Sequence, residues 1–217
     1  MIRLIMFDLD GTLVDTALDL TNALNYAIEP YDIPELTVAR TISLVGEGVS
    51  KLVARVVKGY DPLIYDAVLD RFTGYYAEHL TDASLPYPGV AETLQGLEGR
   101  KKAVVSNKRE AMSKRLLADL GLLDYFDLVL GSDSVDENKP SPKPLLHAIG
   151  ALSSLPEESV MVGDSDFDIL AGRSAGVKTV AVSYGFRPVE SLRDADFIIG
   201  SMAELPALLF RLDAEES

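Results

Sequence analysis

Short apolar runs and stretches with helical spacing alternate along most of the chain. Arg3–Phe7 is such a run, and the Asp-Leu-Asp-Gly sequence that begins at Asp8 predicts that a buried strand ends there. The same pattern predicts further strands at Lys102–Val105, Phe126–Leu130, Ser159–Val162, Thr179–Val182 and Phe197–Ile199. Helices are predicted in the intervals, at Glu110–Leu120, Pro142–Leu152, Phe167–Ala175 and Ala203–Leu212. Apolar strands that alternate with helices predict an α/β fold with a Rossmann-like, doubly wound parallel sheet covered on both faces.

A long segment near the N-terminus interrupts this alternation. Between about residues 16 and 80 the sequence shows no convincing strand, and apolar residues recur at helical spacing instead. Helices are expected there at Ala17–Ile28, Val49–Val57 and Tyr65–Tyr76. We therefore expect residues 15–82 to form an inserted all-α cap domain, within a core domain made of residues 1–14 and 83–217. The last residues, DAEES, are expected to be frayed.

Length and composition are those of a globular protein with its own hydrophobic core. The chain has 217 residues, of which 47% are hydrophobic and 25% are charged. The absence of cysteine excludes disulfides, thiolate zinc sites, iron–sulfur clusters and cysteine nucleophiles. No run of about 18 apolar residues predicts a membrane-spanning helix, and the first apolar run meets Asp8 too soon for a signal peptide. We expect a cytoplasmic protein that is a monomer or a homodimer.

The net charge of the chain is strongly negative. Acidic residues outnumber basic residues by 34 to 20, which gives a net charge of −14. A surface of this charge repels nucleic-acid backbones and anionic lipid, so partners of both kinds are disfavoured. A local basic pocket is still compatible with a small anion, and a small phosphorylated metabolite is the expected partner.

Polar and charged residues follow four of the predicted strands. In doubly wound sheets a ligand binds at the carboxyl ends of the strands, so these residues are expected to meet at one edge of the sheet. A single Asp or Ser in such a place is usually a turn former or a helix cap, but a set from four strands is harder to explain in that way. The set consists of Asp8 and Asp10, Ser106 with Asn107 and Lys108, Lys139, and Asp164 with Ser165 and Asp168.

This combination of residue types favours phosphoryl transfer. Clustered carboxylates repel one another unless a cation lies among them, and oxygen ligands without histidine or cysteine favour Mg²⁺. The metal, a lysine and backbone N–H groups can neutralise a phosphate monoester so that an anionic nucleophile can approach. One aspartate can then attack phosphorus and form an aspartyl-phosphate. A second carboxylate two residues away can protonate the leaving alkoxide and later accept a proton from water.

In this order and spacing the residues resemble the four motifs of the haloacid dehalogenase superfamily. The motif residues are Asp8-x-Asp10-Gly11-Thr12-Leu13-Val14-Asp15, Ser106, Lys139-Pro140 and Gly163-Asp164-Ser165-x-x-Asp168. The resemblance spans the chain and implies that the helical segment is a cap of the C1 type. Segments typical of the phosphoglycolate phosphatase subgroup are Ser106-Asn107-Lys108, Tyr87-Pro88-Gly89-Val90 and Val45-Gly46-x-Gly48. The implied activity is Mg²⁺-dependent hydrolysis of a small phosphomonoester through an aspartyl-phosphate, with 2-phosphoglycolate as the expected substrate.

The resemblance also implies a role for each carboxylate of the motifs. Asp8 is the implied nucleophile and a metal ligand. Asp10 is the implied general acid and base, and its backbone carbonyl binds the metal. Asp164 is a further metal ligand, and Asp168 is expected to support the ligands without binding the ion itself.

The remaining motif residues are implied to bind the phosphoryl group. Ser106 and the N–H of Asn107 would hold its oxygens, and Lys139 would compensate charge on the nucleophile and the phosphate. Lys139 is preferred to Lys143 because the family pattern is a lysine followed by proline, with another proline two residues later. Lys143 lacks that second proline and is expected on a helix surface.

Other chemistries are weighed against this hypothesis. Dehalogenases of the superfamily lack the second aspartate of the first motif, because displacing halide needs no acid, so Asp10 argues against that activity. Phosphonatases use a cap lysine, and Lys51 and Lys58 leave that chemistry open. A sugar-phosphate mutase would use the same core, but Asn107-Lys108 after Ser106 is less typical of that subgroup. A pyrophosphatase also stays open. An aspartyl-phosphate switch protein would use similar residues, but such domains are shorter and place the acceptor after a later strand.

Two patterns that resemble other sites are interpreted as structural. The segment 172–176 has the G-x-S-x-G spacing of a hydrolase nucleophile elbow, but both histidines, His79 and His147, precede Ser174. Both histidines are expected to be structural or surface residues. The sequence Asp164-x-Asp166-x-Asp168 lacks the glycine and the glutamate that a calcium-binding loop needs.

The cap is expected to contribute to substrate recognition. Gly46 and Gly48 lack the other residues of a phosphate-binding loop, so a cap hinge or a substrate-loop turn is expected there. Residues 46–51 and Lys108 are candidates for reading the non-phosphate end of the substrate.

Overall fold

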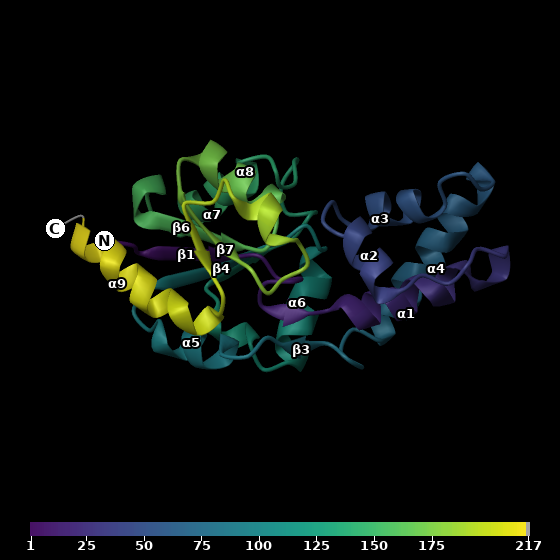
Figure 1. Ribbon diagram of the computed structural model, residues 1–217, viewed down its shortest axis with the longest axis horizontal. Helices are drawn as coiled ribbons and strands as arrows, with labels where there is room; N and C mark the ends of the chain where they lie inside the picture. Colours follow the sequence, from purple (N-terminus) through teal and green to yellow (C-terminus); the bar gives the residue numbers. More distant parts are fainter. Residues whose placement is uncertain (216–217) are drawn as a thin grey trace.

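The described residues form a six-stranded parallel sheet at the centre of the core (Figure 1). The structure is a computed structural model that describes residues 1–215. The strands lie in the order β5-β4-β1-β6-β7-β8. Their bounds are β1 Leu4–Phe7, β4 Lys101–Val105, β5 Leu128–Leu130, β6 Ser159–Gly163, β7 Lys178–Val182 and β8 Phe197–Ile199. Every strand predicted from an apolar run is present, which confirms the α/β fold.

Alternating side chains of the buried strands separate two apolar layers. In the central strand β1, Ile5 and Phe7 belong to one cluster and Leu4 and Met6 to the cluster on the opposite face. The first cluster includes buried residues of α5 (Val90–Gly96), α6 (Glu110–Asp119) and α9 (Leu205–Glu215). The second includes residues of α7 (Lys143–Ala151) and α8 (Asp166–Ala175). Because both faces are covered, the strands carry apolar residues at nearly every position.

The helical segment has an apolar cluster of its own. It consists of α1 (Ala17–Ile28), α2 (Val38–Leu44), α3 (Val49–Val56) and α4 (Tyr65–Glu78). The buried members of the cluster all lie between residues 20 and 80. Figure 1 shows these helices beside the sheet rather than over either of its faces. The three predicted helices of this segment are present, and the domain boundaries at residues 15 and 82 stay a prediction that the separate cluster supports.

Several short elements were not predicted. The chain leaves and re-enters the core through β2 (Val14–Asp15) and β3 (Leu85–Pro86), which pair antiparallel. Helices α2 and α5 have seven residues each. Two turns are too short to show a clear helical period, so local turn chemistry and tertiary contacts decide these elements.

The C-terminal residues are more ordered than expected. Helix α9 continues to residue 215, so the prediction of a frayed DAEES tail is wrong for residues 213–215, and residues 216 and 217 lie outside the described part. Asp213 accepts hydrogen bonds from the backbone N–H of Ile2 at 2.6 Å and from Arg100 at 2.7 Å, which ties the end of α9 to the start of the chain.

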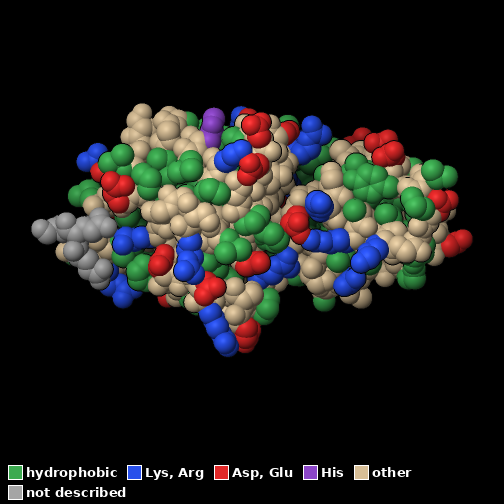
Figure 2. Space-filling view, turned by 90° about the horizontal axis from the view of Figure 1, so that it is seen from above, with side chains coloured by type: hydrophobic (Ala, Val, Ile, Leu, Met, Phe, Trp, Pro, Cys, Tyr) green, Lys and Arg blue, Asp and Glu red, His purple; other side chains and the backbone are tan. Residues whose placement is uncertain are grey.

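Charged side chains of both signs lie on the surface of the protein (Figure 2). On the face shown in Figure 2, acidic and basic side chains are interspersed rather than segregated. Within the described residues, no helix combines the length and the apolar character that crossing a bilayer requires.

Candidate active site

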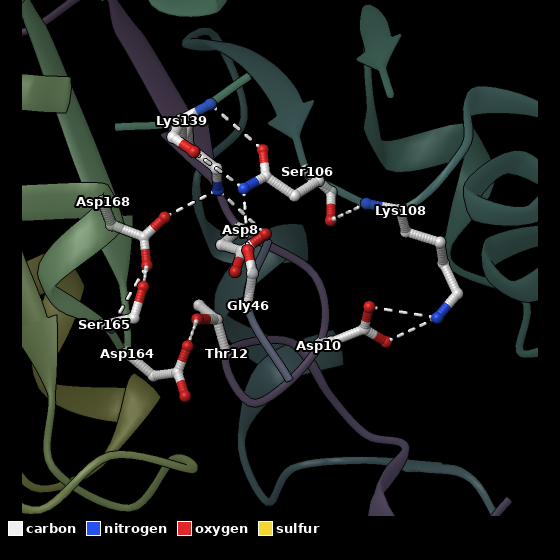
Figure 3. A network of polar contacts seen from close by, with 11 residues as sticks. Asp8, Asp10, Thr12, Gly46, Ser106, Lys108, Lys139, Asp164, Ser165 and Asp168 are labelled. Carbon is white, nitrogen blue, oxygen red and sulfur yellow. Dashed lines mark hydrogen bonds and ion pairs between the residues drawn. The ribbon is translucent and has the colours of Figure 1, made fainter. Parts of the chain in front are cut away.

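The carboxyl ends of three neighbouring strands bring the predicted site residues together. Asp8 directly follows β1, Ser106 directly follows β4, and Asp164 directly follows β6. Lys139 comes from the loop between β5 and α7. Figure 3 shows the polar side chains of these segments converging on one place. The strand order therefore assembles residues that lie far apart in the sequence.

Three carboxylates form a compact acidic group. Asp8, Asp164 and Asp168 each offer an oxygen, and these atoms lie within 4.8 Å of one another. Lys139 supplies the counter-charge, since its Nζ lies 3.0 Å from Oδ1 of Asp8 and 2.6 Å from Oδ1 of Asp168. The Lys139 side chain is only 2% exposed, so solvent and salt screen these ion pairs weakly.

Asp168 is held from two sides. Ser165 is the N-cap residue of α8, and its backbone N–H and hydroxyl donate to Oδ2 of Asp168 at 3.1 and 2.6 Å. The two residues form a capping box at the helix N-terminus. Because Lys139 occupies Oδ1, both oxygens of Asp168 are already engaged. This arrangement agrees with a supporting role for Asp168, which fixes Lys139 and the start of α8.

Asp164 depends on a loop that the motif analysis did not include. The backbone N–H of Phe186 donates to its Oδ2 at 2.7 Å, and the Thr12 hydroxyl lies 3.4 Å from its Oδ1. Phe186 lies in the loop after β7, so extending the search for polar contacts to the carboxyl end of that strand could have found this segment. Gly11 leaves the space that Asp164 needs, because a Cβ at Gly11 would lie 2.4 Å from Oδ2.

Burial makes the acidic group costly to ionise. It raises the pKa of Asp8 to about 6, although Lys139 stabilises the charge. Burial and repulsion by Asp168 and Asp8 also raise the pKa of Asp164 well above its ordinary value. Within the described residues, the buried Oδ1 of Asp8 has the ion pair with Lys139 but no well-aligned hydrogen bond. Carboxylates that repel one another and keep an oxygen without a hydrogen bond are a donor set that fits a hard divalent cation.

The segment after β4 contacts both Lys139 and the helical segment. The Asn107 amide donates to the carbonyl oxygens of Gly46 at 2.7 Å and Lys139 at 2.9 Å, and it accepts from the backbone N–H of Lys139 at 3.1 Å. The backbone N–H of Asn107 finds no acceptor among the described residues. Next to it, the Ser106 hydroxyl accepts the N–H of Lys108 at 3.3 Å. A hydroxyl and a backbone donor are thus side by side at the end of β4.

Asp10 lies outside the acidic group. Its carboxylate accepts from the Thr16 hydroxyl at 2.7 Å and from Lys108 Nζ at 2.8 and 3.0 Å. Lys108 also donates to the hydroxyl of Tyr76, at 2.8 Å, on α4 of the helical segment. Tyr76 has no separate signal in the sequence, because it lies within a regular apolar helix pattern.

The pocket over these residues is formed jointly by the core and the helical segment. Gly46 and Gly48 line it, so the predicted glycine turn covers the site. The Arg187 guanidinium donates to the carbonyls of Ile42, at 2.8 Å, and Val45, and so fixes that turn to the core.

The residues that were expected to lie outside the active site are found on the surface or in contacts away from it. Lys143 is exposed and pairs with Glu137 at 2.5 Å, away from the pocket. Ser174 is exposed on α8. His147 is exposed, and His79 pairs with Asp82 at 2.7 Å.

Comparisons with known proteins agree with this architecture. The family model described as haloacid dehalogenase-like hydrolase matches residues 5–182. A protein of Chromobacterium violaceum named phosphoglycolate phosphatase is 40% identical over 96% of both chains. One of Aquifex aeolicus with the same name is 37% identical over 95% of this chain and 96% of its own. A crystal structure from Haemophilus somnus, described as a predicted phosphoglycolate phosphatase, superposes with a TM-score of 0.91 at 32% identity and covers 96% of this chain and 98% of its own. The chain belongs to the haloacid dehalogenase-like hydrolase family.

Proposed function

We propose that the protein is a Mg²⁺-dependent phosphatase that hydrolyses 2-phosphoglycolate through an aspartyl-phosphate on Asp8. The observation that carries this proposal is the position of Asp8, which pairs with the buried Lys139 at 3.0 Å inside an acidic group at the end of β1. The substrate is suggested by the relatives named phosphoglycolate phosphatase, whose similarity extends over nearly the whole chain. A cytoplasmic location and a monomeric or homodimeric state stay predictions from the sequence.

The donor set fits Mg²⁺. Asp8, Asp164 and the backbone carbonyl of Asp10 would hold the ion, with Asp168 fixing Lys139 and the start of α8 beside them. When bound, Mg²⁺ supplies positive charge that offsets the repulsion between the phosphate and the carboxylates. Asp8 and Asp164 have raised pKa values because they are buried together, so a cation among them would favour their ionised forms.

The side chains of the core divide the reaction between them. The Asp8 carboxylate attacks phosphorus, the bond from phosphorus to the ester oxygen breaks, and Asp10 gives that oxygen a proton. Asp10 then takes a proton from water, which attacks phosphorus and releases phosphate and free Asp8. The Ser106 hydroxyl, the Asn107 N–H and Lys139 hold the phosphoryl oxygens and offset the charge that develops on them.

The test is phosphate release from a panel of small phosphomonoesters, including 2-phosphoglycolate, with Mg²⁺ or with EDTA. Asp8→Asn is the test variant. Asp166→Asn is its matched control, because Asp166 is an exposed aspartate in the first turn of α8. We expect Mg²⁺-dependent turnover that vanishes in Asp8→Asn and persists in Asp166→Asn. Unchanged turnover in Asp8→Asn would refute the mechanism.

The same panel separates the alternative functions. Stable phosphorylation of Asp8 without turnover of any ester would favour a switch protein or a sugar-phosphate mutase, and preferred release from pyrophosphate would favour a pyrophosphatase. A phosphonatase is disfavoured, because Lys51 and Lys58 are exposed and neither lines the pocket.

A further inference from the structure

A second buried ammonium lies in the pocket, apart from Lys139. The Lys108 side chain is 6% exposed and faces Asp10 and Tyr76, with both Asp10 oxygens within 3.0 Å of its Nζ. The Asp10 carboxylate faces this buried ammonium with both oxygens and supplies its counter-charge. Figure 3 shows Lys108 reaching Asp10 at the end of the network away from Asp168. Two of the cations that line the pocket are therefore buried ammonium groups, Lys139 beside Asp8 and Lys108 beside Asp10.

Tyr76 offers a second donor beside this ammonium. The Tyr76 side chain is among the most deeply buried, and burial raises its pKa to about 12, so the hydroxyl keeps its proton at neutral pH. The hydroxyl accepts from Lys108, and the part of the chain that the structure describes provides no acceptor for its own proton. Buried hydroxyl protons are normally hydrogen-bonded. The Tyr76 hydroxyl can therefore donate to an oxygen placed beside Lys108.

The position of Lys108 relative to Asp10 defines which part of a substrate it meets. Under the proposed function, Asp10 contacts the ester oxygen that leaves. Since Lys108 Nζ lies 2.8 Å from Asp10 Oδ1, an oxygen-bearing group a bond or two beyond the ester oxygen comes within its reach. Other pocket walls contributed by the helical segment are apolar, at Leu20, Leu52 and Phe72.

We propose that Lys108 and Tyr76 form a subsite for a carboxylate on the carbon next to the ester oxygen, so that the enzyme selects phosphate esters of 2-hydroxy acids over esters of neutral alcohols. This inference rests on the proposed function and names the residues that give it its selectivity. One of the two Lys108 contacts to Asp10 would be exchanged for a charge-assisted hydrogen bond to the carboxylate, and the Tyr76 hydroxyl would donate the second.

Arg187 is the rival cation in the pocket. Its guanidinium has no carboxylate partner among the described residues, but it is fixed on the backbone carbonyls of Ile42 and Val45. Arg187 therefore serves to hold the glycine turn of the helical segment, whereas Lys108 lies directly beside the group that meets the leaving oxygen. If Lys108 binds the carboxylate, selectivity should change when Lys108 is replaced. If Arg187 binds it, selectivity should change when Arg187 is replaced.

The experiment compares kcat/KM for 2-phosphoglycolate with kcat/KM for 2-hydroxyethyl phosphate, a neutral ester of similar size. We expect Lys108→Met to lower the ratio of the two values roughly 10- to 100-fold, and Tyr76→Phe to lower it about 3- to 10-fold. Any misplacement of Asp10 affects both esters and cancels in the ratio. Lys143→Met is the matched control, because it removes an exposed lysine outside the pocket, and it leaves the ratio unchanged.

A binding arm covers the case in which Lys108→Met is inactive on both esters. Calorimetric titration of Asp8→Asn and of Asp8→Asn with Lys108→Met then measures the affinity for each ester in the presence of Mg²⁺. Weaker binding of 2-phosphoglycolate alone supports the subsite, and equal weakening of both esters overturns it. An unchanged ratio in Lys108→Met, or a ratio that moves only in Arg187→Met, also overturns it. If the wild type turns over none of the esters, both the subsite and the proposed function are overturned. If the wild type turns over 2-phosphoglycolate but the ratio is unaltered in Lys108→Met, only the subsite is overturned.

Discussion

At the scale of single residues, small local requirements decide where the charged groups lie. Gly11 has φ +84°, a left-handed conformation that favours glycine, and its missing Cβ leaves room for the Asp164 carboxylate. Lys139 rather than Lys143 enters the site, as the proline pattern predicted. The segment of Phe186 could have been found by extending to β7 the rule that site residues follow the carboxyl ends of the strands. Tyr76 could not, because a tyrosine in an amphipathic helix gives the same pattern whether it faces an apolar core or a substrate.

Replacing Gly11 tests this local requirement. Gly11→Ala places a methyl group 2.4 Å from Oδ2 of Asp164, so we expect kcat/KM to fall at least about tenfold as the carboxylate moves. Gly59→Ala is the matched control, with φ +94° and no atom within 4 Å of the added carbon. Both variants lose about 1–2 kcal/mol of stability from the left-handed backbone, but only Gly11→Ala loses activity. Denaturation curves and steady-state kinetics measure the two effects, and equal activity in the two variants would contradict the argument.

At the scale of elements, the long strands and helices were predictable and the short ones were not. Strands such as β1 and β6 are buried on both faces, so their apolar runs are visible in the sequence. The two-residue strands β2 and β3 carry no periodic pattern, because their pairing depends on where the helical segment leaves and rejoins the core. The N-terminus of α8 is both a helix start and part of the site, since Ser165 caps the helix while holding Asp168.

Removing this cap separates its two contributions. Ser165→Ala deletes the 2.6 Å hydrogen bond to Asp168, so we expect a loss of about 1 kcal/mol in stability together with a several-fold drop in turnover. Thr37→Ala is the control, because Thr37 caps α2 by accepting from the Arg40 N–H at 3.2 Å and lies outside the pocket. It should lose similar stability and keep full turnover. Full turnover in Ser165→Ala as well would show that Asp168 needs only Lys139.

At the scale of the whole molecule, the site lies where two separately packed bodies meet. The sheet supplies Asp8, Asp10 and Asp164, and the helical segment closes the pocket with Tyr76 and the turn at Gly46. At the site, the three buried carboxylates of Asp8, Asp164 and Asp168 share a single buried counter-charge, the ammonium of Lys139. In the folded protein without a metal ion these carboxylates therefore repel one another, and a cation bound among them would relieve that repulsion.

This repulsion predicts a coupling between metal and stability that needs no substrate to observe. Mg²⁺ at 100 times its Kd should stabilise the folded protein by about 2.7 kcal/mol, and EDTA should reverse the gain. We expect Asp164→Asn to abolish most of this dependence and Asp166→Asn to retain it. Thermal unfolding followed by circular dichroism, with and without Mg²⁺, is the measurement. A Tm shift of equal size in Asp164→Asn would place the ion elsewhere.

The sequence by itself determined the sheet, the helical insertion, and the carboxylates, hydroxyl and lysine at the strand ends. These features depend on short-range periodicity and on the rule that parallel strands present their carboxyl ends at one edge. Only the tertiary structure decided that Lys108 bridges Asp10 and Tyr76, that Phe186 holds Asp164, and that Arg187 fixes the turn at Val45. Those contacts join residues from separate elements, and their geometry depends on how the helical segment packs beside the sheet, which no local pattern records.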